Sequence, residues 1–370
     1  MRITVAHEWL TNWAGSEQVM ARLVGLVSPD RVVASVVDPE IARRHLPGVP
    51  VRELWPSRLP GAHGHWQRYA PAMLAAWAGA RIEADALVVS SHFAAHAATF
   101  RFDGPSIVYY HTPARILWRP DIELERLPAR FRTPAERLLL PPLRRWDRIV
   151  SAHPSVPVAN SSAVAARIRD AYGREAEVVH PPVDVARFSD VARDPEPRHL
   201  LWLGRLVAYK RADVAVEAAR RTGLKLVVIG DGPERAALER AAPANVEFRG
   251  HAPESEVRDA LSKAHALVFP GEEDFGIAPV EALAAGVPVV ALGAGGALDY
   301  VREGSNGLLV KTQDPDDWAE ALRVAVDATW NERVIRESAA PFDAATFDAA
   351  MSRVLDRTLG PDRAAAGANR

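Results

Sequence analysis

The sequence of 370 residues contains no cysteine. This absence excludes disulfide bonds, thiolate metal sites and a cysteine nucleophile, and it fits a reducing compartment such as the cytoplasm. No apolar run approaches the roughly 18 residues that cross a bilayer, so we expect no membrane-spanning helix. The chain enters a strand pattern at Ile3 without an apolar leader, which argues against a secretory signal. We therefore expect a cytoplasmic protein.

An excess of charge of either sign is also missing. The formal net charge is -2, which argues against a protein whose whole surface binds nucleic acid. The apolar share of 48% and charged share of 25% are typical of globular proteins. A chain of this length is long for one hydrophobic core, so two domains are expected.

Short apolar runs alternate with helical patterns along the chain. In the first half we predict strands at 3–6, 32–37, 86–90, 107–110, 156–159 and 178–180. In the second half we predict them at 200–203, 226–229, 246–248, 266–269, 289–291 and 308–310. These runs are almost continuously apolar, which indicates parallel sheets covered by helices on both faces. The fold class is therefore α/β, with two such units.

The domain boundaries follow from composition. We place an N-terminal domain at 1–183, a linker rich in Pro, Asp and Arg at 184–197, and a C-terminal domain at 198–341. A final helix is expected at 342–359, followed by a disordered tail at 360–370. Ligands of such sheets bind beyond the carboxyl ends of the strands, so a cleft between the two domains is the expected site.

The most informative segment follows the strand at 266–269. An acidic loop, Glu272–Asp274, precedes Phe275–Ile277, which open a helix that runs to Ala285. A helix N-terminus suits a phosphate, and the carboxylates can accept hydrogen bonds from sugar hydroxyls. Glu281 follows Glu273 by eight residues, so both can border one site. The alternative is a loop of solvated acids before a core helix.

Two cations follow the strand at 200–203. Arg205 and Lys210 lie in the turn that leads to the next helix. A diphosphate leaving group gains negative charge as its bond breaks, and each nearby cation stabilises it by roughly 4 kcal/mol before desolvation. The pattern alone is also typical of a solvated helix face.

A tight turn at Gly230-Asp231 follows the strand at 226–229. It either lets a nucleobase or ribose approach the backbone or is a plain turn between strand and helix. In the first domain, Gly15 and Ser16 begin a helix whose backbone N–H groups suit a diphosphate. The dinucleotide fingerprint Gly-x-Gly-x-x-Gly is absent there, which counts against a nicotinamide dehydrogenase.

His111 ends the strand at 107–110. A histidine at such a strand end can orient or deprotonate an acceptor hydroxyl. The alternative is a loop histidine that only packs. The serines of Ser90-Ser91-His92 and Asn160-Ser161-Ser162 are expected to cap the helices that follow them.

These segments, together with His7–Leu10, Ala14–Glu17 and Val178–Asp184, resemble family 4 glycosyltransferases of the two-Rossmann-domain (GT-B) type. The resemblance is strongest to bacterial O-antigen and exopolysaccharide mannosyltransferases. It implies retaining transfer of a hexose, expected to be mannose from GDP-mannose, to a glycan or lipid-linked saccharide. It also implies no metal or other cofactor, and a final helix that crosses back to the first domain.

The resemblance also assigns roles to residues. It implies that His111 lies near the reaction centre, that Arg205 and Lys210 hold the diphosphate, and that Glu273 holds the donor sugar. Ala14 stands where relatives carry the first of two glycines. The further donor-binding residues it implies are Gly15, Ser16, Gly230, Asp231, Asp274, Phe275, Gly276, Ile277 and Glu281.

Two short motifs are misleading. Asp274-Phe275-Gly276 spells the metal-binding tripeptide of protein kinases, but the chain has no Gly-rich phosphate loop and no His-Arg-Asp loop. Asp314-Pro315-Asp316 has the Asp-x-Asp form that binds metal in single-domain glycosyltransferases. Because proline favours the first helical turn, we predict that Asp314 caps a helix instead.

An Arg-rich segment spans 126–148. Between His111 and Val150 there are nine arginines and five acids. This segment either docks on anionic lipid at the inner membrane face or forms a packed helical pair with solvated arginines. Two other functions remain open, namely a nucleotide-sugar 2-epimerase and a non-catalytic nucleotide-sugar-binding partner in a glycan assembly complex.

Overall fold

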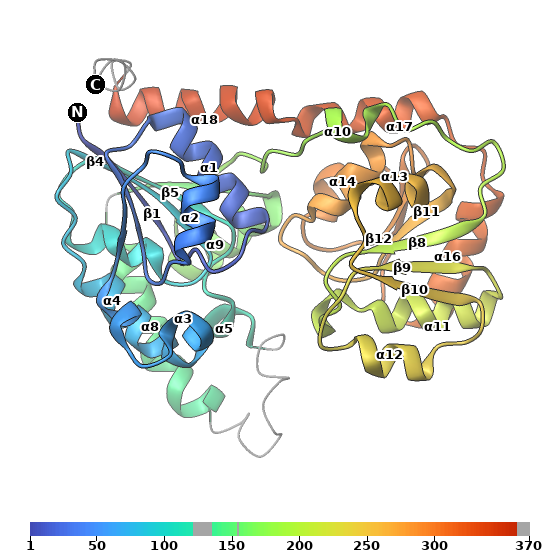
Figure 1. Ribbon diagram of the computed structural model, residues 1–370, viewed down its shortest axis with the longest axis horizontal. Coiled ribbons are helices and arrows are strands. Elements are labelled where there is room, and N and C mark those ends of the chain that lie inside the picture. The colour runs from blue at the N-terminus through green and yellow to red at the C-terminus, as the bar shows by residue number, and fades with distance from the viewer. Residues whose placement is uncertain (121–134, 154, 361–370) are drawn as a thin grey trace. The chain divides into compact units, whose positions relative to one another are not determined.

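The computed structural model describes residues 1–120, 135–153 and 155–360 of the chain. It forms two compact units, each built around its own sheet (Figure 1). Unit 1 comprises Met1–Asn160, Val164–His180 and Asp348–Arg370. Unit 2 comprises Ser161–Ala163 and Pro181–Phe347.

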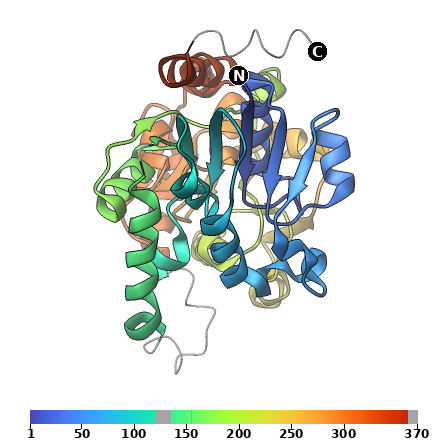
Figure 2. The same ribbon diagram turned by 90° about the vertical axis from the view of Figure 1, so that its left-hand side faces the viewer.

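Unit 1 contains a seven-stranded sheet, all of whose pairings are parallel, in the order β3-β2-β1-β4-β5-β6-β7 (Figure 2). Its strands are β1 (Ile3–His7), β2 (Arg31–Ala34), β3 (Val51–Glu53), β4 (Ala86–Ser91), β5 (Ser106–Tyr110), β6 (Val156–Ala159) and β7 (Glu177–Val178). Its longer helices are α1 (Gly15–Val27), α2 (Pro39–His45), α4 (Ala70–Gly79), α8 (Leu140–Ser151) and α9 (Ser162–Tyr172). The shorter ones include α3 (Ala62–His65), η3 (Ala95–Arg101) and α5 (Arg115–Trp118).

Every second strand residue of unit 1 faces one core. Ala6, Leu87 and Val108 pack there with Trp77 of α4 and Val150 of α8. Helix α1 contacts β1 and β4 and buries an apolar stripe at Val19, Met20, Leu23, Val24 and Val27. The neighbouring strand positions Val5, Val88 and Ile107 are fully buried as well, which explains the almost continuous apolar runs in the sequence.

Unit 2 contains a six-stranded parallel sheet in the order β10-β9-β8-β11-β12-β13. Its strands are β8 (His199–Leu203), β9 (Leu226–Ile229), β10 (Val246–Gly250), β11 (Ala264–Phe269), β12 (Val289–Leu292) and β13 (Gly307–Val310). Its helices include α10 (Ala186–Ser189), α11 (Ala212–Thr222), α12 (Arg235–Ala241), α13 (Glu254–Ser262), α14 (Ile277–Ala284), α15 (Ala297–Tyr300), α16 (Pro315–Asp327) and α17 (Glu332–Ala339). A short 3-10 turn, η6, spans Ala208–Lys210.

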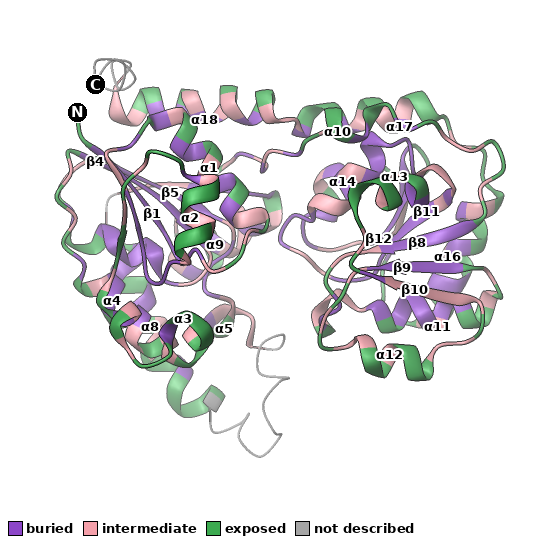
Figure 3. Ribbon diagram, viewed as in Figure 1, coloured by how far each residue is buried: buried purple, intermediate pink, exposed green. Residues whose placement is uncertain are grey.

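The two faces of this sheet carry separate cores, seen as buried strands in Figure 3. Leu201 and Leu267 face the core that contains residues of α13, α14 and α17. Leu200 and Val268 face the core that contains residues of α11 and α16. The expectation of an α/β fold with helices on both faces of parallel sheets is confirmed.

Each sheet pairs two strands that are not consecutive in the chain. In unit 1 these are β1 and β4, and in unit 2 they are β8 and β11. At such a switch point the connections leave the strand ends in opposite directions. The register sets His7 beside Ser90, and Ser90 beside Tyr109 of β5. Polar residues from distant parts of the chain therefore lie side by side at these strand ends.

Most predicted elements are confirmed, with differences at the ends. Strand β2 stops at Ala34 rather than 37, although Val37 still forms a bridge with Leu10. Strand β3 and helix α17 were not predicted. The Asn331 cap of α17 accepts a hydrogen bond from the Val334 N–H. The final helix, α18 (Ala344–Leu359), begins in unit 2 and continues in unit 1 from Asp348. The expected tail lies outside the described residues except for Gly360.

Within the described ranges, no helix has both the length and the apolar character needed to span a bilayer.

The ends of β8 and β9 approach each other very closely. Gly230 has φ +139°, and a Cβ atom there would lie 1.7 Å from the carbonyl oxygen of Gly204. We expect Gly230→Ala to lower the free energy of unfolding by about 3 kcal/mol or more, measured by urea denaturation, because backbone must move. Gly223→Ala is the matched control, since Gly223 has φ +73° and open space around it. That substitution should lower the free energy of unfolding by only about 1 kcal/mol. Equal losses of stability in the two variants would contradict the steric explanation.

Candidate functional site

A buried ion pair lies at the switch point of unit 2. Lys210 ends η6, which follows β8, and Glu273 lies in the loop after β11. The Lys210 Nζ and Glu273 Oε1 atoms are 2.7 Å apart, and each side chain is only 16% exposed. Burial alone would lower the pKa of Lys210, yet the attraction of Glu273 and Tyr209 leaves it above its usual value of 10.5. Lys210 is therefore a cation at neutral pH, held where water has limited access.

The backbone around this pair is closely packed. A Cβ atom on Gly271 would lie 2.7 Å from the Lys210 Cα atom, so a side chain there would separate the two strand ends. The Gly296 N–H donates to the Glu273 carbonyl oxygen at 2.9 Å. These contacts fix the loop between β11 and α14 from both sides.

Arg205 stands beside the pair and is exposed. Its charge acts on Lys210, where it lowers the pKa. Among the described residues no carboxylate lies within ion-pair distance of its guanidinium. The predicted cations are thus brought together in one region, one buried and one at the surface.

The segment Asp274–Ile277 leads from the acidic loop into α14. Phe275 is 3% exposed, and its ring packs edge-on against Tyr300 and at a tilt against Phe342, with ring centroids 5.5 and 5.7 Å away. Its side chain belongs to the core, so only its backbone could serve a ligand. Gly276 precedes the helix with φ +91°, and α14 begins at Ile277. Asp274 is buried, at 8% exposed.

Glu281 lies on α14, while Glu273 lies in the loop before it, so the two acids do not share a helical face. Burial raises the pKa of Glu281, and the nearby acids Asp184 and Glu254 add to this while Arg187 opposes it. In the described part of the chain no group forms a hydrogen bond with its carboxylate. The hydroxyl groups of a ligand would be suitable hydrogen-bond donors to this carboxylate.

The turn at Gly230-Asp231 is held by its own contacts. The Asp231 carboxylate accepts from the Gly232 N–H at 2.7 Å and from Arg235 at 3.2 Å. The Asp231 carbonyl accepts from the Leu206 N–H at 2.8 Å. These contacts are those of a plain turn between a strand and a helix. A role of Gly230 and Asp231 in binding the donor stays a prediction.

Helix α1 of unit 1 begins at Gly15, and Ser16 follows. The Glu17 Oε2 atom accepts hydrogen bonds from the Ala14 N–H and the Ser16 hydroxyl, both at 3.0 Å. Burial raises the pKa of Glu17, but the stronger combined effect of His7 and His92 lowers it to about 2. The helix therefore begins on a buried carboxylate that sequence reasoning did not single out.

His111 follows β5 and joins a buried polar cluster. Its Nε2 atom lies 2.9 Å from the Ser90 hydroxyl, which lies 3.1 Å from the His7 Nδ1 atom. Ser90 was expected to cap a helix, but its hydroxyl contacts these two rings instead. Ser91 fits that expectation, since its hydroxyl accepts from the His96 N–H at 3.2 Å.

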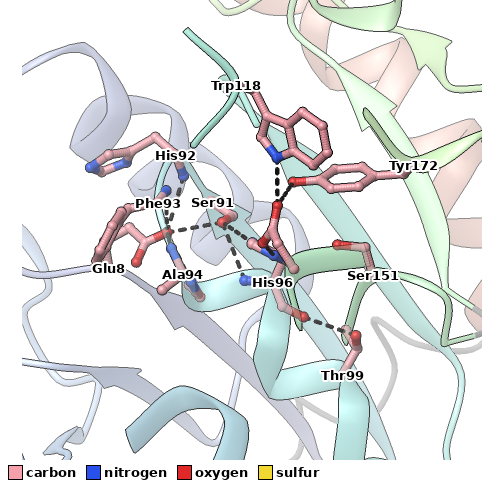
Figure 4. A network of polar contacts seen from close by, with 12 residues as sticks. Glu8, Ser91, His92, Phe93, Ala94, His96, Thr99, Trp118, Ser151 and Tyr172 are labelled. Carbon is pink, nitrogen blue, oxygen red and sulfur yellow. Dashed lines mark hydrogen bonds and ion pairs between the residues drawn. The ribbon is translucent and has the colours of Figure 1, made fainter. Parts of the chain in front are cut away.

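Glu8, also missed in the sequence, holds the loop after β4 (Figure 4). Its Oε1 atom accepts from the Ser91 hydroxyl and from the backbone N–H groups of His92–Ala95, at 2.8 to 3.1 Å. A fully buried carboxylate is costly unless donors surround it, and here a helix N-terminus provides them. Glu8 thereby fixes the loop next to the histidine cluster.

A second buried carboxylate, Asp147 of α8, continues this network. Its Oδ1 atom lies 2.8 Å from His96 Nε2, and its Oδ2 atom accepts from Trp118 at 2.7 Å and Tyr172 at 2.9 Å. Trp118 and Tyr172 are labelled in Figure 4, where dashed lines mark these two hydrogen bonds. Asp147 thus ties α5, α8 and α9 to the loop after β4. In the sequence Asp147 is one acid among the arginines of the Arg-rich segment, and only the fold reveals its partners.

Asp314 caps α16 as predicted, because its side chain accepts from the Asp316 N–H at 2.9 Å. No group of three or more histidines and acids suited to a metal ion occurs among the described residues.

Comparison with known proteins defines the class of protein. Two solved structures match nearly the whole chain, both with a TM-score of 0.72. One is the Anabaena protein Alr3699/HepE in complex with UDP, 17% identical, covering 96% of this chain and 100% of that one. The other is sucrose-phosphate synthase from Thermosynechococcus elongatus, 16% identical, covering 96% and 99%. At these identities the likeness shows the fold, which is GT-B.

The sequence comparisons give the family. The family model described as "Glycosyltransferase Family 4" matches residues 15–187, and that described as "Glycosyl transferases group 1" matches 186–340. The D-inositol 3-phosphate glycosyltransferase of Streptosporangium roseum is 30% identical over 236 residues, which are 55% of this chain and 54% of that protein. The chain thus spans about half the length of the curated relatives it matches first. It belongs to the family 4 glycosyltransferases.

The partly buried Glu281 gives a pH-dependent prediction. Because its pKa is raised above 4.5 in the folded state, folding binds its proton more tightly. Its contribution to the free energy of unfolding is therefore fully present below pH 4.5 and is lost as pH rises through the raised pKa. We expect Glu281→Gln to gain stability relative to the unmodified protein as pH rises from 4 to 8, measured by urea denaturation.

The control for this prediction is Glu256→Gln on α13, an exposed acid in the same unit. It should show no such trend. A Glu281→Gln protein whose relative stability does not change with pH would contradict the desolvation explanation.

Proposed function

We propose that this protein transfers a hexose from a nucleoside-diphosphate sugar to a glycan or lipid-linked saccharide, with retention at the anomeric carbon and without a metal. The observation that carries this proposal is the buried Lys210–Glu273 pair at the switch point of unit 2, with Arg205 beside it. Together these groups offer two cations to a diphosphate and a carboxylate to sugar hydroxyls.

The chemistry follows from the charges. When the sugar leaves, negative charge grows on the diphosphate, and the buried Lys210 ammonium meets it where water is scarce. Arg205 adds a planar fork of donors suited to phosphate oxygens. In the structure the Glu273 carboxylate forms an ion pair with Lys210. As the phosphate takes over Lys210, the Glu273 carboxylate becomes available to accept hydrogen bonds from the sugar.

We assign the acceptor to unit 1 and place His111 next to its reacting hydroxyl. His111 is a group that can accept or orient a proton near neutral pH. Glu281 is assigned to the ribose, since none of the described residues donates a hydrogen bond to its partly buried carboxylate.

The donor we propose is GDP-mannose. A relative from Mycolicibacterium smegmatis, 35% identical over 161 residues covering 41% of this chain and 42% of that protein, bears the name "GDP-mannose-dependent alpha-mannosyltransferase". The Anabaena neighbour was solved with UDP, so the base must be measured directly. Thermal shifts with GDP-mannose, UDP-glucose, ADP-glucose and a dTDP sugar test this. A ligand at 100 times its Kd stabilises by about 2.7 kcal/mol.

Transfer must then be distinguished from the epimerase and the non-catalytic alternatives. Release of nucleotide only when a saccharide acceptor is present supports transfer, and turnover retained in EDTA supports the metal-free mechanism. Interconversion of the donor sugar without an acceptor would instead indicate a 2-epimerase.

A location on the inner face of the cytoplasmic membrane is also part of the proposal. In the described part of the Arg-rich segment, Leu138 and Leu139 are 71% and 59% exposed, an apolar surface that lipid could cover. By contrast, Arg144 donates to the Leu117 carbonyl and Arg148 to the Ala171 carbonyl, as expected of a packed helix. Residues 126–134 of the segment lie outside the described ranges.

The donor assignment predicts that Lys210→Ala lowers turnover about a hundredfold or more, because the leaving diphosphate loses its buried cation. The measurement is acceptor-dependent release of nucleotide. Lys225→Ala serves as the control, since Lys225 also forms an ion pair, with Glu247 at 2.8 Å, but is about half exposed. Folded Lys210→Ala protein with near-normal transfer would exclude this role.

The acceptor assignment predicts that His111→Ala lowers transfer strongly. Donor affinity, measured by calorimetry, should change less than about threefold, or roughly 0.65 kcal/mol, since the donor is assigned to unit 2. His65→Ala, an exposed histidine of α3, should leave both unchanged. Wild-type turnover of the His111→Ala protein would show that His111 is only a packed loop residue. Complete loss of donor binding would show that His111 binds the donor instead.

A further inference from the structure

A groove runs along the outer face of helix α1 in unit 1. Its volume is about 510 Å³, which is within the usual range of ligand sites. Trp13, just before α1, lines one end of the groove, and Asp348 of α18 also lines it. The other lining residues follow one another along α1 and are Gln18, Ala21, Arg22, Gly25 and Leu26. All of them belong to unit 1, and the chemistry proposed above uses none of them.

The groove begins near the strand ends of unit 1. Helix α1 follows β1, and seven residues separate His7, at the end of β1, from Gly15, the first residue of the helix. From Gly15 to Leu26 the helix is about 17 Å long. Because residues from Trp13 to Leu26 line the groove, it extends away from the strand ends over that length. A chain of several sugar rings would fill it better than a single sugar.

Trp13 gives the groove an aromatic wall. Its ring is stacked on His45 of α2, with ring centroids 3.7 Å apart and an angle of 10° between the ring planes. This stacking holds the indole in one orientation. None of the described residues accepts a hydrogen bond from the indole N–H of Trp13. An indole combines a large apolar ring with one N–H donor, so the C–H groups of a pyranose can pack on it while a hydroxyl accepts from the N–H.

The two charged residues of the groove neutralise each other. The Arg22 Nε atom donates to Asp348 Oδ1 at 2.6 Å, and Arg22 Nη2 donates to Oδ2 of the same carboxylate. Gln18 is exposed and adds an uncharged amide that both donates and accepts. The residues that line the groove therefore carry no net charge, which does not suit a phosphate or an anionic lipid. A paired guanidinium and carboxylate instead place donors and acceptors side by side, as neighbouring hydroxyl groups require.

Gly25 leaves the middle of the groove open. Glycine inside a helix is less favourable than alanine, so its presence there calls for a reason. Gly25 does not have a positive φ, and a Cβ atom at this position would meet no heavy atom within 4 Å. Neither the backbone conformation nor a close neighbour therefore requires glycine. What the missing side chain provides is open space along the groove.

We propose that this groove binds a neutral chain of hexose units, namely the part of the acceptor that extends beyond the reacting sugar. The aromatic wall, the balance of charge and the length of the groove all favour such a ligand. That the groove binds a saccharide follows from its own residues. That this saccharide is the acceptor rests on the proposed function, which assigns the acceptor to unit 1.

Binding to the groove can be measured without turnover. The probes are mannohexaose and maltohexaose, with mannobiose and maltose as their short counterparts, titrated into the full-length protein by calorimetry. We expect at least one hexasaccharide to bind about tenfold more tightly than its disaccharide, because the longer chain contacts more of the groove. Failure of both hexasaccharides to bind, or equal affinities for long and short chains, would overturn the proposal.

Removal of the aromatic wall tests the role of Trp13. Trp13→Ala should weaken binding of the hexasaccharide about tenfold, because the sugar rings lose the face on which they pack. Trp55→Ala is the matched control, since Trp55 of η1 (Trp55–Arg58) is 48% exposed and does not line the groove. Unchanged affinity in folded Trp13→Ala protein would contradict the proposed site.

Gly25→Leu fills the groove without removing a contact. Leucine favours helices more than glycine does, so this variant should fold, as urea denaturation can verify. We expect it to weaken hexasaccharide binding about tenfold or more. Gly79→Leu is the matched control, since Gly79 of α4 is also an exposed glycine with no heavy atom within 4 Å of an added Cβ. If light scattering shows that the unmodified protein self-associates and Gly25→Leu does not, the groove is an interface between copies and the proposal is wrong.

Transfer assays separate the groove from the proposed function. Gly25→Leu should raise the KM for a hexasaccharide acceptor about tenfold more than the KM for a monosaccharide acceptor, and Gly79→Leu should change neither. If saccharides bind in the groove but none is glycosylated, the proposed function is wrong while the groove stands. If transfer occurs and Gly25→Leu changes no acceptor KM, the groove is wrong while the proposed function stands.

Discussion

Parallel pairing between strands that are not neighbours in the sequence is the constraint on which this structure depends. β1 pairs with β4, and β8 pairs with β11, in both cases at the point where the strand order reverses. The register places His7 next to Ser90, although 83 residues separate them. In unit 2 the same geometry brings Lys210 to Glu273. Each unit thus gathers its polar groups at the carboxyl ends of its central strands.

Those polar groups are buried, so the protein must compensate for their desolvation. Glu8 does so with backbone N–H groups at a helix start, and Asp147 with His96, Trp118 and Tyr172. Lys210 is compensated by an opposite charge. Glu281 differs, since no described group donates to it and its pKa is raised by burial. Under the function proposed above, the ribose of the donor would supply the missing hydrogen-bond donors to Glu281.

Much of the fold could be predicted from the sequence, because the spacing of apolar residues and the composition of a segment are local properties. The strands of unit 2 were predicted to within about two residues, since most of them are buried on both faces and consist mainly of apolar residues. Lys210 and Glu273 were predicted as parts of one site from the family resemblance and are paired in the structure. Glu8 and Ser90 were not predicted in their roles, because their partners lie more than 20 residues away. Membership of the family 4 glycosyltransferases, in turn, rests on the sequence matches.

The sequence by itself determined the α/β class, the order of strands and helices along the chain, and which residue types stand at strand ends. These follow from side-chain period, from turn residues and from the composition of short segments. Only the tertiary structure decided which strand ends meet, how far Lys210 is buried, and that Ser90 bridges two histidines rather than capping a helix. The physical reason is that register between distant strands depends on how whole faces pack together, and no local segment encodes that packing.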